Sequence, residues 1–221
     1  MDPIIPPLDK EILEAELSEI TFLRNTNNGR NKIFVFTAQE APNLMKEVGR
    51  LREITFRDAG GGTGKSVDID EFDTMDIPFQ QLIVWDPVDR EVTGGYRFIH
   101  GKDIKCKGSG CLRSATAELF TFSQWFVREY LPVSIELGRS FVQPAYQPLI
   151  NFRKGMYSLD NLWDGLGAMI IENPDVRHFF GKMTMYPDYN RYARDCVLYF
   201  LRRYFPDNET LMTPIEAVKS E

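Results

Sequence analysis

The 221-residue sequence is poor in cysteine and histidine. Its three cysteines are an odd number without zinc-ligand spacing, and its two histidines lie far apart, with no nucleophile turn of the Gly-x-Ser-x-Gly type. This pattern disfavours a metal site or a catalytic triad, so we expect no bound metal. Any catalysis must rely on carboxylates, arginines and backbone groups, and the cysteine usage indicates a reducing cytoplasm.

Long apolar runs are also missing. No stretch approaches the roughly 18 residues that a membrane-spanning helix needs, and no apolar leader follows the acidic start Met1-Asp2-Pro3. The net charge of −6 disfavours general nucleic-acid binding, because phosphates require a positive field. We expect a cytoplasmic protein without a nucleic-acid partner, and we leave open a peripheral contact with the inner membrane.

What the sequence does contain is an alternation of strand and helix patterns. Apolar runs of strand length predict strands, and apolar residues at helical spacing predict helices. Strands are expected at residues 32–36, 81–85, 92–99, 134–142 and 178–185, and helices at 9–17, 41–57, 118–130, from Ser158 onward and at 190–204. This mixed order predicts an α/β sheet with helices on both faces.

Two stretches mimic ligand-binding motifs. Residues 59–66 (Ala-Gly-Gly-Gly-Thr-Gly-Lys-Ser) nearly match a phosphate-binding P-loop, but a helix enters them and an acidic extended run leaves, whereas the motif needs a strand before and a helix after. The acids that begin at Asp68 fail the calcium-loop spacing, because Phe72 and Asp73 occupy its fifth and sixth positions. We interpret the first stretch as a flexible connection. The second is a solvated acidic loop or a cluster that receives a cationic amine.

Four separated segments carry a family resemblance. They are residues 51–56 (Leu-Arg-Glu-Ile-Thr-Phe), 70–73 (Asp-Glu-Phe-Asp), 94–98 (Gly-Gly-Tyr-Arg-Phe) and 135–142 (Ile-Glu-Leu-Gly-Arg-Ser-Phe-Val). In this order they resemble the GNAT-superfamily branch of acyl-homoserine-lactone synthases and ornithine-lipid N-acyltransferases. The last segment looks closer to the lipid-forming enzymes, which are often labelled hemolysin-like.

The resemblance covers about residues 32–204 and implies a GNAT-like α/β fold with a mixed, mostly antiparallel central sheet. We therefore divide the chain into an N-terminal helical segment (residues 1–31), a GNAT-like domain (32–205) and a polar C-terminal tail (206–221). A GNAT fold usually adds closing strands after its last helix. None is predicted in the tail, so we expect a shortened sheet or a truncated chain.

The resemblance also implies an enzyme that moves a long acyl group, 3-hydroxy forms included, from acyl carrier protein to the α-amine of an amino acid. Ornithine, lysine and glycine are acceptors of this group, whose products are aminolipids. No tightly bound cofactor is expected, because the carrier's phosphopantetheine thioester, or an acyl-CoA, is a co-substrate. Carried over by position, the substrate-binding residues are Arg52, Phe56, Asp70, Asp73 and Arg97, and the catalytic residues are Glu136 and Arg139.

The chemistry of amide formation fits these residue types. Direct attack of an amine on a thioester needs a neutral amine, and a free α-amine is mostly protonated at neutral pH. We expect Glu136 to accept that proton. Asp70 and Asp73 would attract the ammonium form, while Arg97 and Arg139 would hold the acceptor carboxylate. The alternative is that these acids and arginines form a buried ion network with a structural role.

The acyl donor is expected to lie beyond the strand at 134–142. The following loop, residues 143–148, lacks the glycine cradle with which GNAT enzymes hold the pyrophosphate of coenzyme A. A carrier arm brings one phosphodiester, for which a basic pair could suffice. The predicted donor-binding residues are Phe141, Val142, Arg153 and Lys154, and the predicted carrier-docking residues are Lys102, Lys105, Lys107 and Arg113. Arg194, Arg202 and Arg203 form a second candidate docking patch.

Two other functions compete with this prediction. A short-chain N-acetyltransferase that uses coenzyme A would share the fold but would favour a glycine cradle. A non-catalytic GNAT-like interaction domain would bury Glu136 in a closed ion network. The aromatic stretch at 119–130 is interpreted as core, with the lining of an acyl-chain tunnel as the functional alternative.

Overall fold

A computed structural model describes residues 1–107, 111–148, 150, 152–186 and 188–216. The chain divides into two compact units, which are described separately. The first unit contains Met1–Ile99 and Leu137–Val176, and the second contains His100–Glu136 and Arg177–Glu221. Strand β8 (Ser134–Val142) runs from the second unit into the first.

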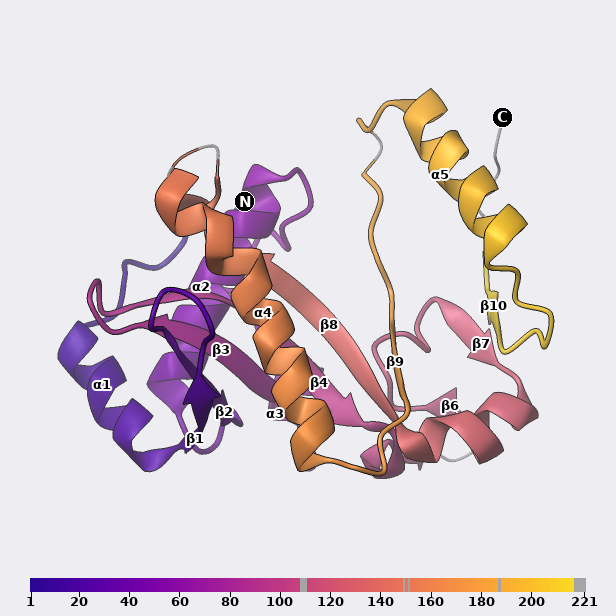
Figure 1. Ribbon diagram of the computed structural model, residues 1–221, viewed down its shortest axis with the longest axis horizontal. Helices are drawn as coiled ribbons and strands as arrows, with labels where there is room; N and C mark the ends of the chain where they lie inside the picture. The colour runs from indigo at the N-terminus through magenta and orange to yellow at the C-terminus, as the bar shows by residue number, and fades with distance from the viewer. Residues whose placement is uncertain (108–110, 149, 151, 187, 217–221) are drawn as a thin grey trace. The chain divides into compact units, whose positions relative to one another are not determined.

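The main sheet has the strand order β1-β2-β3-β4-β8-β9. In the first unit, β1 (Thr21–Asn25), β2 (Lys32–Phe36), β3 (Gln80–Asp86) and β4 (Glu91–His100) form successive antiparallel pairs. Helices cover both faces: α4 lies in front of the strands in Figure 1 and α2 lies behind them. The predicted fold class, a mostly antiparallel sheet with helices on both faces, is confirmed.

One face of the sheet packs on α1 (Lys10–Glu19) and α2 (Pro42–Asp58). Strand residues such as Ile83 meet helix residues such as Leu44 in a shared apolar core. Thr37 and Glu40 form reciprocal backbone-to-side-chain hydrogen bonds in the turn that precedes α2. The first turn of α2 is instead capped from α1, because the Glu16 carboxylate accepts hydrogen bonds from the backbone amides of Asn43 and Leu44.

The other face packs on α4 (Phe152–Glu172). A methyl group on Gly165 would lie 2.8 Å from Leu82 Cδ2 and 2.9 Å from the hydroxyl of Tyr96, so glycine allows this helix to approach the sheet. The helix begins at Phe152, whereas the sequence predicted a cap at Ser158. Ser158 instead lies inside the helix, and its hydroxyl donates to the carbonyl of Lys154 one turn earlier.

Two short elements complete the first unit. Helix α3 (Glu71–Thr74) begins with a capping box in which Asp70 and Asp73 satisfy each other's backbone amides. A 3-10 turn, η4 (Pro144–Tyr146), follows β8. The acidic run is therefore folded against the sheet rather than solvated.

The second unit contains short elements. In chain order they are η1 (Gly101–Asp103), β5 (Cys106–Lys107), β6 (Cys111–Leu112), β7 (Phe120–Phe122), the π-helix η2 (Phe126–Tyr130), η3 (Leu131–Val133), β9 (His178–Gly181), α5 (Arg191–Tyr204) and β10 (Met212–Pro214). The single helix predicted at 118–130 is wrong, because a strand and a π-helix occupy it. Part of the predicted tail forms β10, which pairs antiparallel with β7. Within the described ranges, no helix is long and apolar enough to cross a bilayer.

Candidate functional site

Three buried polar side chains from different elements meet in the first unit. Arg52 on α2 places Nη1 3.3 Å from Oδ1 of Asp73, and Gln81 on β3 donates to the same oxygen at 3.0 Å. Arg52 also donates to the side-chain oxygen of Gln81. All three residues are fully buried, and burial lowers the pKa of Arg52 although the charge of Asp73 opposes it. The cluster joins the helix, α3 and the sheet.

Arg97 on β4 extends this cluster. Its Nη1 donates to Oδ1 of Asp70 at 2.6 Å and to Oδ2 of Asp73 at 3.1 Å, while its guanidinium lies over the rings of Phe72 and Phe79. Burial would raise the pKa of Asp70, but the hydrogen bond and charge of Arg97 outweigh burial and hold that pKa below its usual range. Burial would lower the pKa of Arg97, and its carboxylate partners raise it instead.

Arg139 on β8 is the third arginine of this cluster of charged residues. Its Nε lies 2.9 Å from Oδ2 of Asp68, its Nη2 lies 3.5 Å from Oδ2 of Asp70, and its guanidinium lies 6.0 Å from the Phe56 ring centre. Its backbone has a φ of 52°, a conformation that costs a non-glycine residue of order 1–3 kcal/mol. Such strain is characteristic of functional sites, where surrounding contacts hold the side chain in one position.

The exposure of these residues separates structural roles from binding roles. Arg52 and Asp73 are fully buried and Arg97 is 3% exposed, so their charged groups are used inside the protein. The side chains of Arg139 and Asp70 remain 31% and 26% exposed. The buried ion network that the sequence left as an alternative is therefore present. Within it, the side chains of Arg139 and Asp70 are the ones that solvent reaches.

Glu53, one residue beyond Arg52, is a buried acid to which the sequence analysis assigned no role. Its carboxylate accepts hydrogen bonds from Arg57, from the amide and hydroxyl of Thr63, and from the amide of Gly64. The glycine-rich stretch thus wraps a carboxylate of its own chain with the amide donors that a P-loop offers to phosphate. This explains why the P-loop mimic is a structural loop. In the sequence, the signal for this arrangement is that Glu53 lies one helical turn before Arg57.

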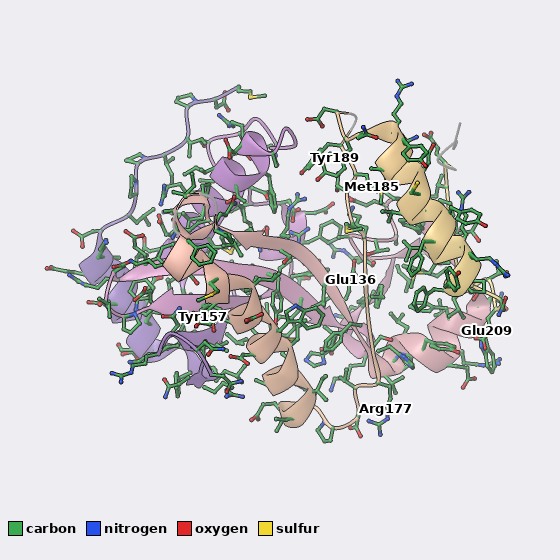
Figure 2. All side chains as sticks on the ribbon, turned by 45° about the horizontal axis from the view of Figure 1, so that its top comes forward. Glu136, Tyr157, Arg177, Met185, Tyr189 and Glu209 are labelled. Atoms are coloured by element: carbon green, nitrogen blue, oxygen red, sulfur yellow. The ribbon has the colours of Figure 1, made fainter. Side chains whose placement is uncertain are left out.

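Glu136, which is labelled in Figure 2, lies on β8 in the part of that strand that belongs to the second unit. It is 1% exposed, and its Oε1 accepts hydrogen bonds at 2.7 Å from both the amide and the hydroxyl of Thr116. The Ser114 hydroxyl accepts from the same amide at 3.2 Å and so supports the turn that carries Thr116. These contacts hold the carboxylate in one orientation. No sequence motif pointed to Thr116, and the role of Glu136 as base stays a prediction.

The predicted donor-binding residues have different surroundings. Phe141 is 4% exposed and packs in the apolar core of the first unit, which assigns its ring a packing role. The Val142 carbonyl accepts a hydrogen bond from the Gln147 side chain at 3.0 Å. Lys154 forms an ion pair with Asp89. The side chain of Arg153 lies outside the described residues.

The predicted carrier-docking residues lie in the second unit. Lys102 and Lys105 are exposed, and Arg113 is half-buried. The backbone amide of Arg113 donates to the carbonyl of Lys105 at 2.9 Å, so these two residues lie side by side. The side chain of Lys107 is outside the described residues. Lys102 and Lys105 present positive charge on the surface, and a docking role for them stays a prediction.

Comparisons with known proteins identify the family of the chain. Residues 51–151 match the acetyltransferase (GNAT) domain family. A protein of Phocaeicola vulgatus named glycine N(alpha)-acyltransferase is 53% identical over 221 residues, covering 100% of this chain and 68% of the relative. A Bacteroides thetaiotaomicron protein of the same name is 55% identical over 216 residues, covering 98% of this chain and 64% of the relative. The chain thus spans about two thirds of their length, and no solved structure matches it. The chain belongs to the GNAT family of N-acyltransferases.

Proposed function

We propose that the chain transfers an acyl group from a thioester to the α-amine of glycine, giving an N-acylglycine and a free thiol. The observation that carries this proposal is the identity of 53% and 55% to two proteins named glycine N(alpha)-acyltransferase. In the reaction a C–N bond forms and the C–S bond of the thioester breaks. The ammonium form of glycine releases one proton to a base before attack, and the amide nitrogen loses a second proton as the product forms.

Arg139 and Asp70 are proposed to bind the acceptor. Free glycine is a zwitterion at neutral pH, with a carboxylate and an ammonium group separated by one carbon. A partly exposed guanidinium and a partly exposed carboxylate, whose Nη2 and Oδ2 atoms lie 3.5 Å apart, offer one partner to each group. The remaining charged members of the network, Arg52, Asp68, Asp73 and Arg97, are buried and hold this pair in position.

Glu136 is proposed as the base that receives the proton of the ammonium group. A carboxylate is the expected base because the sequence has two histidines far apart, and the resemblance to GNAT N-acyltransferases supports Glu136 in this role. The two hydrogen bonds from Thr116 fix one of its oxygens, which gives the other oxygen a defined direction.

The donor is proposed to be a long-chain acyl group, 3-hydroxy forms included, on acyl carrier protein in the cytoplasm. The loop after β8 supports this, because its side chains bond to neighbouring backbone: Gln143 donates to the carbonyl of Val92 and Gln147 to that of Val142. No glycine cradle for a pyrophosphate is present at residues 143–148. The exposed Lys102 and Lys105 are proposed to attract the acidic carrier, and the product is proposed to lead to an aminolipid.

A short-chain acetyltransferase that uses coenzyme A is the second candidate. It is favoured by the match of residues 51–151 to a family described as an acetyltransferase domain. The two candidates differ in the donor and in the length of the acyl chain, so one experiment separates them.

The test supplies purified protein with ¹³C-labelled glycine and, in parallel, palmitoyl carrier protein, palmitoyl-CoA or acetyl-CoA, and detects labelled amides by mass spectrometry. We expect N-palmitoylglycine, with the carrier protein as the better donor. N-acetylglycine from acetyl-CoA alone would favour the second candidate. Absence of any labelled amide from folded protein would contradict both. Glu129→Gln, which changes an exposed acid of the same unit, is the matched control for Glu136→Gln.

A further inference from the structure

Helix α5 (Arg191–Tyr204) buries none of its side chains. Val197, Phe200, Leu201 and Tyr204 are spaced three or four residues apart and therefore share one face of the helix. Their exposed fractions are 46%, 51%, 41% and 65%. The half-buried positions of the helix are instead Arg194, Asp195 and Leu198. The helix thus turns its apolar face toward solvent.

Aromatic rings cluster at the C-terminal end of this face. The ring of Phe200 lies 4.9 Å from that of Tyr204 and 6.0 Å from that of Phe205, which is 70% exposed just beyond the helix. These rings contact one another while staying accessible to water. Exposed aromatic and aliphatic groups gathered on one side of a helix indicate a surface that another phase or molecule covers.

The charge of α5 indicates what covers it. The helix carries four arginines and one aspartate, a net charge of +3, whereas the whole chain carries −6. Arg202 and Arg203 are exposed beside the aromatic cluster, and Arg194 pairs with Asp195 at 2.8 Å. A cationic helix with Phe, Leu and Tyr on one face has the composition of helices that lie in the interface of anionic membranes.

A second exposed apolar surface, on α4, provides a contrast. Leu159 and Trp163 are 59% and 65% exposed there. Their neighbours in the chain are the acids Asp160 and Asp164, which would be repelled by anionic lipid headgroups. Of these two surfaces, α5 is the one whose apolar face is accompanied by positive charge.

We propose that α5 binds the surface of an anionic membrane, with the helix parallel to the surface. Phe200, Leu201 and Tyr204 would enter the acyl-chain boundary, and Arg202 and Arg203 would reach the phosphates. A second copy of the same cationic helix would bring arginines together, and an acidic soluble protein would leave the aromatic rings uncovered. This inference goes beyond the proposed function and does not depend on it.

The test is co-sedimentation of the 221-residue chain with vesicles of equal parts phosphatidylglycerol and phosphatidylcholine, and with pure phosphatidylcholine vesicles. We expect binding to the anionic vesicles that weakens at high salt, and at least tenfold weaker partitioning for Phe200→Asp. Arg202→Gln and Arg203→Gln should each weaken it about fivefold. Tyr199→Asp is the matched control, since Tyr199 is 70% exposed and lies roughly 140° around the helix from Tyr204. Far-UV circular dichroism verifies the fold of each variant.

Three results would overturn the proposal. The first is failure of the wild-type chain to bind anionic vesicles. The second is equal binding by wild type and the two arginine variants, which do not alter the apolar face and serve if Phe200→Asp fails to fold. The third is a dimer in sedimentation equilibrium that Phe200→Asp dissociates, or a complex with acidic carrier protein that Phe200→Asp disrupts, in either case without vesicle binding.

Discussion

Asp73→Asn is the sharpest test of the buried network, because this carboxylate is its central member. Asp73 is fully buried and accepts hydrogen bonds from Arg52, Arg97, Gln81 and the amide of Asp70. An asparagine of the same shape keeps one acceptor oxygen but removes the negative charge. Its NH₂ group would also face a guanidinium, and both groups are hydrogen-bond donors, so they cannot bond to each other.

The expected cost is about 3–5 kcal/mol, the range for removing one partner of a buried ion pair. The variant leaves the buried guanidinium of Arg52 without its carboxylate partner, whereas Arg97 keeps its hydrogen bond to Asp70. Since domains of this size are stable by about 5–15 kcal/mol, the loss would be a large part of the total. Asp76→Asn is the control, because Asp76 is exposed, and it should change stability by about 0.5 kcal/mol or less.

Urea unfolding followed by tryptophan fluorescence measures the difference. Trp85 lies in the core of the first unit and is 3% exposed, whereas Trp125 and Trp163 are 44% and 65% exposed, so the change in signal should report mainly on the first unit. A loss below about 1 kcal/mol for Asp73→Asn, or one equal to that of the control, would show that the network is solvated and contributes little.

Three further predictions concern other acids and the loop that Glu53 holds. Glu53→Ala should cost about 2–4 kcal/mol, because the amides of Thr63 and Gly64 in the glycine-rich loop lose their acceptor. Gly62→Ala should also destabilise the protein, since a methyl group there would lie 2.8 Å from Glu53 Oε1. Urea unfolding measures both effects. Asp70 and Asp68 should respond to pH in opposite senses. The pKa of Asp70 is held low against burial by Arg97, so its stabilisation is present above about pH 3.9 and is lost as the pH falls through the lower folded pKa. Burial raises the pKa of Asp68 despite Arg139, so the stability linked to Asp68 is greatest below about pH 3.9 and is lost as the pH rises. Unfolding of Asp70→Asn and Asp68→Asn between pH 3 and 7 should therefore show deficits with opposite slopes, and equal slopes would refute the assignment. Glu136→Gln should lower kcat by about 10²–10⁴-fold with little change in the KM for glycine, which steady-state kinetics will measure.

Five strands of the main sheet and most helices were predictable from local pattern, whereas β1 and the short strands β5, β6, β7 and β10 were not predicted. The strand at residues 32–36 was predicted with its observed bounds because residues 33–36 are an apolar run of strand length, and the helix at 41–57 was predicted within one residue at each end. Residues 118–130 could not be assigned from pattern, because their aromatic side chains suit helix and strand alike. The position of Ser158 was ambiguous as well, since a hydroxyl that caps a helix also bonds inside one.

The sequence predicted which residues form the site, but not how their side chains contact one another. Arg52, Asp73 and Arg97 were named from the resemblance, but their partners lie 21 and 24 residues apart in sequence, so no local spacing showed that they bury one another. The same holds for Glu136 and Thr116, which are 20 residues apart. The strained backbone of Arg139 had no sequence signal, because an arginine rarely adopts a positive φ.

The most direct test of the account is the rate at which the purified chain forms N-acylglycine from glycine and a long-chain acyl thioester, compared between wild type and Arg139→Met. The account predicts amide formation by wild type and a large rise in the KM for glycine in the variant, with no such rise when methylamine, which lacks the carboxylate, is the acceptor. Equal use of glycine and methylamine by wild type, or an unchanged KM for glycine in Arg139→Met, would contradict it.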